Sequence, residues 1–362
     1  MGDFGKATGG TSIESEFSKD GKYKVISIGS YSENSIYNDQ GIRAIESDKT
    51  SNLVLNRNDL TMILNDKTTS GNIIGRVLLI EKSGIYVYNQ RTERIETNLD
   101  EYDSVFLYEM LNAPNIRAKI IKQAQGNTQI YVNWTTISLL DYMIPSKEEQ
   151  VKIGKYLHGI SNLITLHQRK LILLNKYKRG LLFKIFTSFN RDNLISLKEL
   201  IDKNVIEIKR GNIIPKQYGI YPVYSSSVHN NGLFCYSDNY MFDEELVSWS
   251  IDGGGNFFYR PKHKFSLTNV SGYIRVKDKN ILNTQYLYYN LDYSSRNYNF
   301  DYQNKALPSY ISKLYQIYLL DIKIQNKVST ILSSFDFIIK KEEQILLQLK
   351  QYKQGLLQQM FI

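Results

Sequence analysis

The chain has 362 residues and a formal net charge of +9, with 45 Lys and Arg against 36 Asp and Glu. This length predicts two or more domains, and because the basic residues are spread along the whole chain, the charge fits either an acidic partner or no particular partner. The single cysteine, Cys235, excludes a disulfide framework and a CxxC zinc site, and no apolar run is long enough to cross a membrane, so we expect a cytoplasmic protein without a membrane anchor.

Residues 1–144 contain short apolar runs separated by Gly, Asn and Asp, a pattern typical of strands. The runs YKVISI, RVLLI and GIYVY predict strands, whereas residues 103–111 and 117–125 predict helices. NAPN, at residues 112–115, lacks the second proline and the aromatic residue of the Asn-Pro-Pro-aromatic motif of amino methyltransferases, and it predicts a loop. A mixed α/β domain is therefore expected here.

Residues 145–187 predict one long helix. Pro145 and Ser146, followed by Glu148 and Glu149, form a typical helix start with an N-cap and an acidic first turn. At about 1.5 Å per residue the helix would be a rod of about 60 Å. Its apolar stripe, with steps of three and four residues, consists of Ile153, Leu157, Ile160, Ile164, Leu171, Leu174 and Leu181.

The second half of the chain has the same organisation. In residues 188–320 the runs ELVSW and SGYIRV predict strands and residues 284–291 predict a helix, so a second mixed domain is expected. Residues 321–362 predict a second long helix. Its apolar stripe consists of Val328, Leu332, Phe335, Ile339, Leu346, Leu349 and Leu356.

The two halves form an internal repeat. Residues 150–186 align with residues 325–361 without a gap, and the endings YKRGLLFKIF and YKQGLLQQMF are nearly the same. Weaker echoes pair GNIIGR, 71–76, with GNFFYR, 255–260, and FLYEML, 106–111, with YLYYNL, 286–291. Each half is thus a variable block followed by a helix of fixed length.

The sustained apolar spacing predicts a coiled-coil seam whose two strands come from one chain, but the spacing leaves their direction open. His167 and Glu342 interrupt the two stripes at equivalent places. One hypothesis is that an antiparallel arrangement brings them together and that the pair sets the register. The alternative is that both lie at the edge of the seam in water.

Motifs for catalysis are missing from the sequence. The four histidines show no HExxH spacing, and there is neither a GxxxxGK[ST] loop nor a glycine-rich cofactor strand, so we expect binding rather than catalysis. SIDGGGNFFYR, 250–260, would let backbone approach a phosphate or would simply form a turn. RTERIE, 91–96, either follows DNA or is an ordinary charged strand edge, and the same two interpretations apply to KRGNIIPK, 209–216.

Polar loops carry the candidate DNA contacts, because Arg, Asn and Gln can hydrogen-bond to base edges and Lys and Arg to phosphates. The alternative is that these residues are ordinary surface charges. No catalytic or metal-binding residue is expected. The candidates are Arg43, Arg76, Gln90, Arg91, Arg94 and Asn133 in the first block, and Lys209, Arg210, Asn230, Arg260, Lys262 and Arg296 in the second.

Four segments resemble one known family. Residues 145–186 resemble the conserved helical region of the specificity subunits of type I restriction-modification enzymes, and GNTQIYVNW, 126–134, resembles the segment that leads into it. GKATGGT, near the N-terminus, and LKELIDKNVIEIKRGNIIP, 197–215, resemble the openings of the family's two target recognition domains. The resemblance extends over essentially the whole chain.

The resemblance implies an α+β fold with target recognition domains at 1–144 and 188–320, separated by two antiparallel conserved helices at 145–187 and 321–362 that form a coiled coil. Each domain would read one half of a split site in double-stranded DNA, and the helices would fix the gap between the halves. The chain itself would carry no active site and no cofactor. The chain starts almost directly at its GDFGK-like opening, where relatives commonly carry a short leader, so it is open whether the first strand is present.

The implied partners are two methyltransferase (modification) subunits, which methylate adenine with S-adenosylmethionine, and restriction subunits, which cleave with ATP. The outer faces of the helices would hold these partners, through Lys152, Lys155, Arg169, Lys170, Lys178 and their counterparts in the second copy. A rival interpretation is a coiled-coil scaffold without sequence-specific DNA contact. A third, a stand-alone DNA methyltransferase or nuclease, is disfavoured by the missing motifs.

Overall fold

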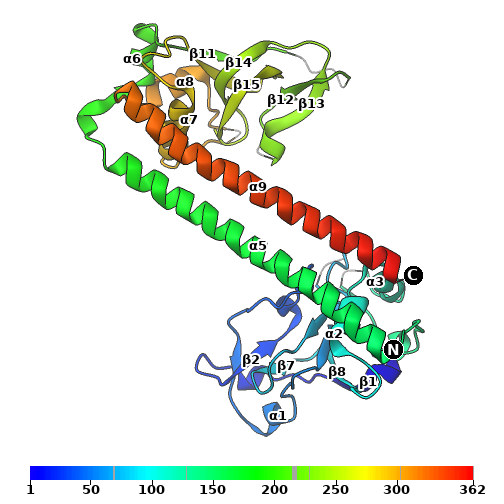
Figure 1. The fold of residues 1–362 in the computed structure, drawn as a ribbon. Helices are drawn as coiled ribbons and strands as arrows, with labels where there is room; N and C mark the ends of the chain where they lie inside the picture. Colours follow the sequence, from blue (N-terminus) through cyan, green and yellow to red (C-terminus); the bar gives the residue numbers. More distant parts are fainter. Residues whose placement is uncertain (68–69, 128, 214–217, 228, 302, 362) are drawn as a thin grey trace. The chain divides into compact units, whose positions relative to one another are not determined.

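The computed structural model describes residues 1–67, 70–127, 129–213, 218–227, 229–301 and 303–361 (Figure 1). The chain divides into two compact units: unit 1 comprises Met1–Gln168 and Gln344–Ile362, and unit 2 comprises Arg169–Glu343. Each unit holds one mixed α/β domain and a segment of each long helix. The predicted fold class is therefore confirmed, and the units divide within the long helices instead of at their ends.

Unit 1 is built on a four-stranded antiparallel sheet of order β1-β8-β4-β6 and a three-stranded sheet of order β3-β2-β7, in which β2 and β7 are parallel. A short β5-β9 pair completes it. The bounds are β1 Gly5–Gly9, β2 Tyr23–Ile26, β3 Arg43–Ala44, α1 Asp48–Ser51, β4 Leu60–Ile63, β5 Asn65–Asp66, β6 Val77–Leu79, β7 Tyr86–Tyr88, β8 Thr92–Thr97, α2 Ser104–Leu111, α3 Pro114–Ile121, β9 Ile130–Tyr131 and α4 Trp134–Ile137, with short 3-10 helices at Gly2–Phe4, Glu14–Glu16 and Ile28–Ser30.

Strand β1 lies at one edge of the four-stranded sheet. Strand β1 runs antiparallel beside β8, with Gly5 opposite Thr97. A Cβ atom at Gly5 would lie 1.9 Å from the carbonyl oxygen of Glu96, so only glycine allows this close approach. Because β8 lies between β1 and β4, RTERIE is an interior strand of the sheet and not its charged edge.

Unit 2 is built on a six-stranded sheet of order β11-β16-β14-β15-β12-β13, in which only the β12–β15 pair is parallel, and a β10-β17 pair. The bounds are β10 Leu194–Ser196, α6 Leu197–Asp202, β11 Ile206–Arg210, β12 Tyr221–Tyr224, β13 Leu233–Ser237, β14 Phe242–Ser250, β15 Phe257–Leu267, β16 Ser271–Val276, α7 Thr284–Ser295, α8 Pro308–Leu314 and β17 Gln316–Tyr318, with short 3-10 helices at Arg191–Asn193 and His229–Gly232.

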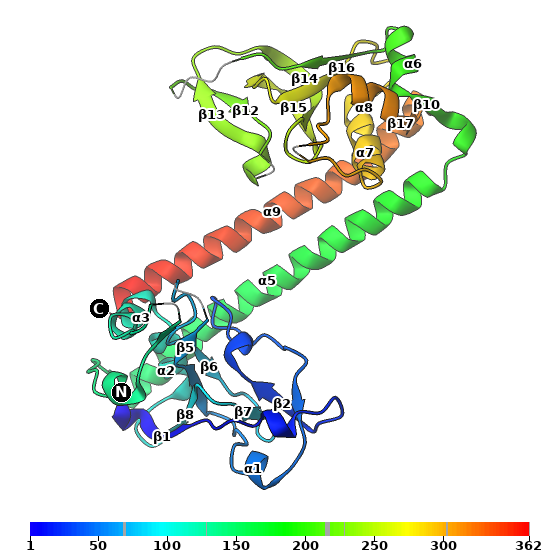
Figure 2. The ribbon, with the colours of Figure 1, turned by 180° about the vertical axis from the view of Figure 1, so that it is seen from behind.

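One helix covers a sheet in each unit. Helix α2 packs on β6, and α7 packs on β14 and β15 (Figures 1 and 2). Both start at an N-cap whose side chain accepts a backbone hydrogen bond, Asp103 from Phe106 N at 2.7 Å and Asn283 from Tyr286 N at 2.8 Å. The loop prediction for NAPN is wrong in its second half, because Pro114 starts α3 as a proline in its first turn.

The long helices are α5, Lys147–Thr187, and α9, Ile322–Met360. Every residue of the two predicted apolar stripes is buried or half-buried. In unit 1 the Tyr156 and Tyr352 hydroxyls of the two helices are 2.7 Å apart. Within each unit, the segments of the two helices lie side by side in both views (Figures 1 and 2).

In unit 2 the helices run antiparallel. Lys170 Nζ lies 2.8 Å from Glu342 Oε2, and Lys178 pairs with Asp336, so rising numbers in α5 meet falling numbers in α9. The Glu342 side chain is only 3% exposed. The interpretation that Glu342 lies in water is therefore wrong, whereas its proposed role in setting the register stays a prediction.

Equivalent glutamines attach the start of each long helix to its own domain. Gln150 accepts a hydrogen bond from Asp103 N at 2.9 Å and donates to Glu101 O and Pro145 O. Gln325 accepts from Asn283 N at 2.9 Å and donates to Ile281 O and Leu320 O. The repeat found in the sequence therefore extends to individual hydrogen bonds.

The end of each long helix enters the core of the other repeat's domain. Phe361, which closes the second repeat, packs in unit 1 with its ring 5.7 Å from that of Phe106. Phe186, which closes the first repeat, packs in unit 2 with its ring 6.0 Å from that of Tyr286. The same helix ending occurs twice in the sequence because each domain has an equivalent place in its core that the ending fills.

Candidate nucleic-acid interface

The β12–β13 loop of unit 2, described at residues 225–227 and 229–232, exposes two asparagines. Asn230 and Asn231 have φ values of 48° and 53°, and Gly232 follows with 80°. Asparagine accepts this left-handed conformation more easily than most residues. The loop is closed by Ser225 N, which donates to Gly232 O at 2.8 Å. The result is a defined turn whose side-chain amides reach solvent.

Arg260 lies beneath this loop and is only 1% exposed. Its Nη1 donates to Asn231 O at 2.8 Å, and its Nε donates to Ser248 Oγ at 2.9 Å. The guanidinium carbon lies 3.8 Å from the Tyr224 ring centre. Burial lowers the pKa of Arg260 to about 10, so the group stays charged at neutral pH. Arg260 therefore holds the loop, and a direct DNA contact would require it to leave these partners.

The glycine-rich segment between β14 and β15 is a packed turn. Ser250 Oγ donates to Ser226 O at 2.9 Å and accepts from Gly253 N at 2.8 Å. A Cβ atom at Gly255 would lie 2.5 Å from the Phe300 ring. Lys305 Nζ, 3.0 Å from Asp252 Oδ1, ties the segment to the loop that follows α7. These contacts favour the turn interpretation over a phosphate cradle and give the β12–β13 loop a firm support.

Unit 1 has an equivalent arginine beneath an equivalent loop. Arg76 aligns with Arg260 in the repeat, and its Nη1 lies 3.2 Å from the Oγ of Ser35, whose φ is 60°. Ser35 Oγ also donates to Asn112 Oδ1 at 2.6 Å. Burial, followed by the nearby Arg117, lowers the pKa of Arg76 to about 10. The loop above, between the 3-10 helix Ile28–Ser30 and β3, exposes Asn34, Asn38 and Gln40.

The other predicted residues of unit 1 lie apart from this loop or are already paired. Gln90 and Arg91 form the exposed β7–β8 turn, where Gln90 Nε2 donates to Glu14 Oε1 at 3.2 Å. Arg94, 13% exposed, lies with its Nε 2.9 Å from Asp59 Oδ2. Arg43 is half-buried opposite Lys24, whereas Asn133 is exposed at the N-cap of α4.

The remaining candidates of unit 2 are exposed. Lys209 lies 3.2 Å from Glu207, and Arg210 Nε donates to Asn269 O at 2.6 Å. Lys262 is exposed on β15, and Arg296 lies at the C-cap of α7 with its Nη2 3.9 Å from Asp292. Part of KRGNIIPK, residues 214–216, lies outside the described residues. Asn230 and Arg260 thus lie in one loop region, Lys209 and Arg210 lie on β11, and Arg296 lies at the end of α7.

The sequence interpretation missed two features. Asn34, Asn38, Gln40 and Asn231 are absent from the predicted contacts, although an Asn-rich stretch is a sequence signal for an exposed turn. The second is an aromatic patch on and beside the β12–β13 hairpin, where Lys264 Nζ lies 4.8 Å from the Tyr240 ring centre. The exposed members of this patch are Tyr218, Ile220, Phe234, Tyr236 and Tyr240.

Within the described part of the chain, no group of three or more His, Cys, Asp or Glu side chains could hold a metal ion. In that same part, no helix is both long enough and apolar enough to cross a bilayer.

Comparison with known proteins gives consistent matches. The structure of a type I restriction-modification system S subunit from M. genitalium superposes with a TM-score of 0.72 at 16% identity, covering 99% of this chain and 93% of that one. This likeness shows a shared fold. A second structure, described as the basis of complex assembly and conformational transition of the type I R-M system, matches with a TM-score of 0.52 at 12% identity, covering 98% and 96%.

Two similar proteins come from Mycoplasma pneumoniae. S.MpnORF285P, named as a type I specificity subunit, is 33% identical over 143 residues, which is 37% of this chain and 46% of that protein. The protein named as the N-terminus of specificity subunit S.MpnORF289P is 36% identical over 147 residues, which is 37% of this chain and 74% of that protein. The match thus spans about half the length of the first relative.

The family model described as the type I restriction modification DNA specificity domain matches twice, at residues 1–176 and 196–351. These two ranges follow the repeat and include most of the chain. The chain therefore belongs to the family of type I restriction-modification specificity subunits, with two specificity domains in one polypeptide.

Proposed function

We propose that each unit reads one half of a two-part target in double-stranded DNA and that the long helices fix the gap between the halves. The observation that carries this proposal is the arginine-braced polar loop, which occurs once in each unit at equivalent repeat positions. The loops differ in sequence, so the two halves of the target would differ as well.

The exposed side chains of these loops suit base reading. Asparagine and glutamine amides can form paired hydrogen bonds with adenine in the major groove, and nearby Lys and Arg can hold phosphates. In unit 2, Asn230 and Asn231 would face bases, while the exposed Lys209 and Lys262 would contact phosphates. In unit 1, Asn34 and Asn38 would face bases, and Arg91 would contact a phosphate.

The partners in this proposal are two methyltransferase (modification) subunits and, in the restriction assembly, restriction subunits. Large apolar side chains exposed on one helix support a docking surface, because such side chains mark protein interfaces when they gather. On α5 these are Val151, Tyr156, Leu163 and Leu166 in unit 1, and Ile172, Leu173, Tyr177 and Phe183 in unit 2.

Among the predicted docking cations, Lys152, Lys155 and Arg169 are exposed. Lys170 is exposed too, but it pairs with Glu342 of α9, and the mostly covered Lys178 pairs with Asp336. We therefore assign partner contact to Lys152, Lys155 and Arg169 and to the apolar residues beside them.

The chain would be non-catalytic and bind no cofactor, with S-adenosylmethionine and ATP bound by the partner subunits. A methylation assay tests this assignment. The isolated chain should transfer no methyl group to DNA, and the assembly with modification subunits should methylate adenine.

Duplex binding tests the main proposal. The chain, assembled with modification subunits, should select one two-part sequence from a randomised duplex pool, and its affinity should fall steeply with salt as phosphate contacts are screened. Retention of no duplex at low salt would contradict the proposal and favour the scaffold interpretation. Selection of an uninterrupted site would contradict the two-unit arrangement.

A further inference from the structure

A lysine at the same repeat position enters each unit from the long helix of the other repeat. Lys353 lies on α9 and belongs to unit 1, whereas Lys178 lies on α5 and belongs to unit 2. The two are identical positions of the endings YKQGLLQQMF and YKRGLLFKIF. Their side chains are 21% and 16% exposed, so each needs a partner inside its unit.

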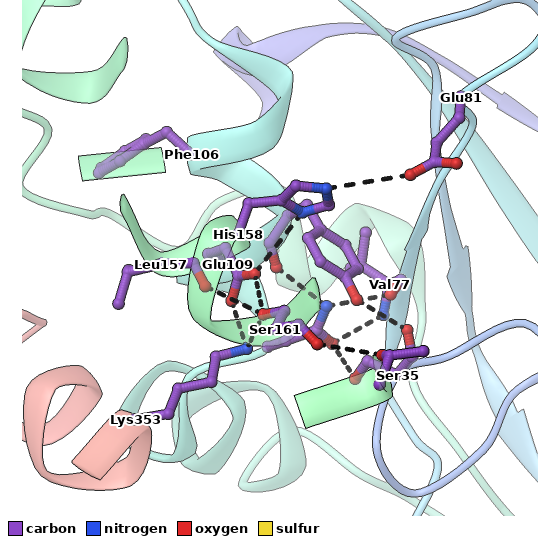
Figure 3. Close-up of polar contacts among 12 residues, drawn as sticks. Ser35, Val77, Glu81, Phe106, Glu109, Leu157, His158, Ser161 and Lys353 are labelled. Atoms are coloured by element: carbon purple, nitrogen blue, oxygen red, sulfur yellow. Dashed lines mark hydrogen bonds and ion pairs between the residues drawn. The ribbon is translucent and has the colours of Figure 1, made fainter. Parts of the chain in front are cut away.

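In unit 1 the carboxylate partner comes from the globular domain. Figure 3 shows Lys353 Nζ beside Glu109 of α2, with 2.7 Å to Oε2, and beside Ser161 of α5, with 2.7 Å to Oγ. Ser161 Oγ in turn donates to Glu109 Oε1 at 2.7 Å. The Glu109 side chain is 1% exposed. One ammonium, one carboxylate and one hydroxyl thus close a nearly buried triad.

In unit 2 the carboxylate partner comes from the long helix. Lys178 pairs with Asp336 of α9, and the Tyr289 hydroxyl of α7 donates to Asp336 Oδ2 at 2.6 Å. Lys178 Nζ also lies 5.6 Å from the Tyr289 ring centre. In the repeat, Tyr289 is equivalent to Glu109 and Asp336 is equivalent to Ser161. The carboxylate and the hydroxyl have exchanged places while the lysine has stayed.

This exchange makes the two domains incompatible with each other's helices. Moving the second domain alone onto the helices of unit 1 would surround Lys353 with the hydroxyls of Tyr289 and Ser161 and no carboxylate. The opposite move would place Glu109 and Asp336 together on Lys178. The first move would leave a mostly buried ammonium without a carboxylate partner, and the second would place two carboxylates next to each other. Both arrangements are unfavourable. Exchange of a domain together with its own long helix keeps every triad complete.

We propose that the residue pairs 109/161 and 289/336 determine which long helix each domain accepts, and that the shared lysine lets any complete repeat close the triad of another. The proposal goes beyond DNA reading, because it concerns how repeats assemble. It predicts that the unit of exchange among such chains is the domain with its own helix.

The test uses the full-length chain. It compares, in three backgrounds, whether the substitution E109Q raises or lowers the unfolding midpoint of unit 1. E109Q should lower the unfolding midpoint of unit 1 by roughly 5–10 °C in the wild-type chain, because it removes the carboxylate from a covered lysine. E109Q should also be destabilising in S161N, which has the shape of aspartate without its charge. In S161D, where two carboxylates share Lys353, E109Q should instead raise the midpoint. Hydrogen exchange of α2 amides assigns the change to unit 1.

The S161N and S161D variants have side chains of nearly the same size, but only S161D adds a negative charge. A steric effect at position 161 would therefore appear in both variants, whereas the predicted stabilisation by E109Q should appear only in S161D. E81Q is the matched control, because Glu81 is an exposed carboxylate of the same unit, 3.9 Å from His158, and its loss should leave the midpoint unchanged. The proposal is overturned if E109Q has the same sign in all three backgrounds. In unit 2, D336N should lower stability by less, since Asp336 is 42% exposed.

Discussion

Arg260 and Arg76 are basic residues of the two specificity domains whose guanidinium groups hydrogen-bond to a loop of their own unit. Arg260 donates to the backbone of Asn231 and to Ser248, and Arg76 donates to the hydroxyl of Ser35. Each guanidinium thereby fixes a loop with exposed polar side chains, and in unit 1 the Asn38 amide also donates to Gly29 O at 3.2 Å. Both arginines were predicted from the sequence as candidate DNA contacts, but the burial of Arg260 and the half-burial of Arg76 come from packing that the sequence does not show.

Substitution of Arg260 should separate loop support from direct contact. R260A removes two hydrogen bonds and an aromatic stack, so it should destabilise unit 2 by about 2–4 kcal/mol and weaken DNA binding at least tenfold. R260K should recover little, because lysine cannot make the forked contacts. K262A, an exposed neighbour, should leave the free energy of unfolding unchanged. A stable R260A protein with wild-type binding would contradict this role.

Glu93 gives unit 1 a pH-dependent stability. Its side chain is buried on β8, and desolvation raises its pKa from 4.5 to about 7. The folded state thus holds the proton more strongly than the unfolded state. The contribution of Glu93 to the free energy of unfolding should therefore be most favourable below about pH 4.5. It should be lost as the pH rises through about 7.

The E93Q variant should be more stable than the wild-type chain at pH 8, by up to about 3 kcal/mol, and should match it near pH 4.5. Chemical denaturation across this pH range measures the difference. E96Q is the control, because Glu96 lies on the same strand but is exposed. This substitution should leave the free energy of unfolding unchanged both near pH 4.5 and at pH 8. A difference that does not vary with pH would rule out Glu93 as the cause.

At the scale of elements, the helix endings join each domain to the opposite repeat. Phe361 lies in the core of unit 1 and Phe186 in the core of unit 2. F361A should therefore destabilise α2 and leave α7 unaffected, and F186A should do the reverse, each by about 3–5 kcal/mol from the cavity created. Hydrogen exchange of α2 and α7 reads both effects. M360A, next to Phe361 but 38% exposed, should have little effect on either helix.

The sequence predicted elements better than it predicted contacts. Apolar spacing identified α5 and α9, and the runs YKVISI, RVLLI, GIYVY, ELVSW and SGYIRV all fall on strands, because local pattern and burial agree there. The N-terminus of α3 was misplaced, since Pro114 starts a helix as readily as it ends one. The order of the sheets and the triad of Glu109, Ser161 and Lys353 depend on contacts between distant residues that no local pattern encodes.

At the scale of the whole molecule, the long helices are proposed to set the gap between the two half-sites. Inserting one heptad into each helix keeps the apolar seam in phase and adds about 10 Å. We expect the number of unread base pairs to rise by about three, since duplex DNA advances about 3.4 Å per pair. An unchanged gap in the selected sequence would show that something other than helix length sets it.

The most direct test of two-unit reading is a map of methylated adenines in cells that carry this chain with modification subunits. N230G/N231G removes two loop amides while keeping a backbone conformation that glycine adopts readily. The wild-type map should show one two-part sequence, and the variant map should lose specificity only in the half read by unit 2. Loss in both halves, or a wild-type map without a two-part sequence, would contradict the account.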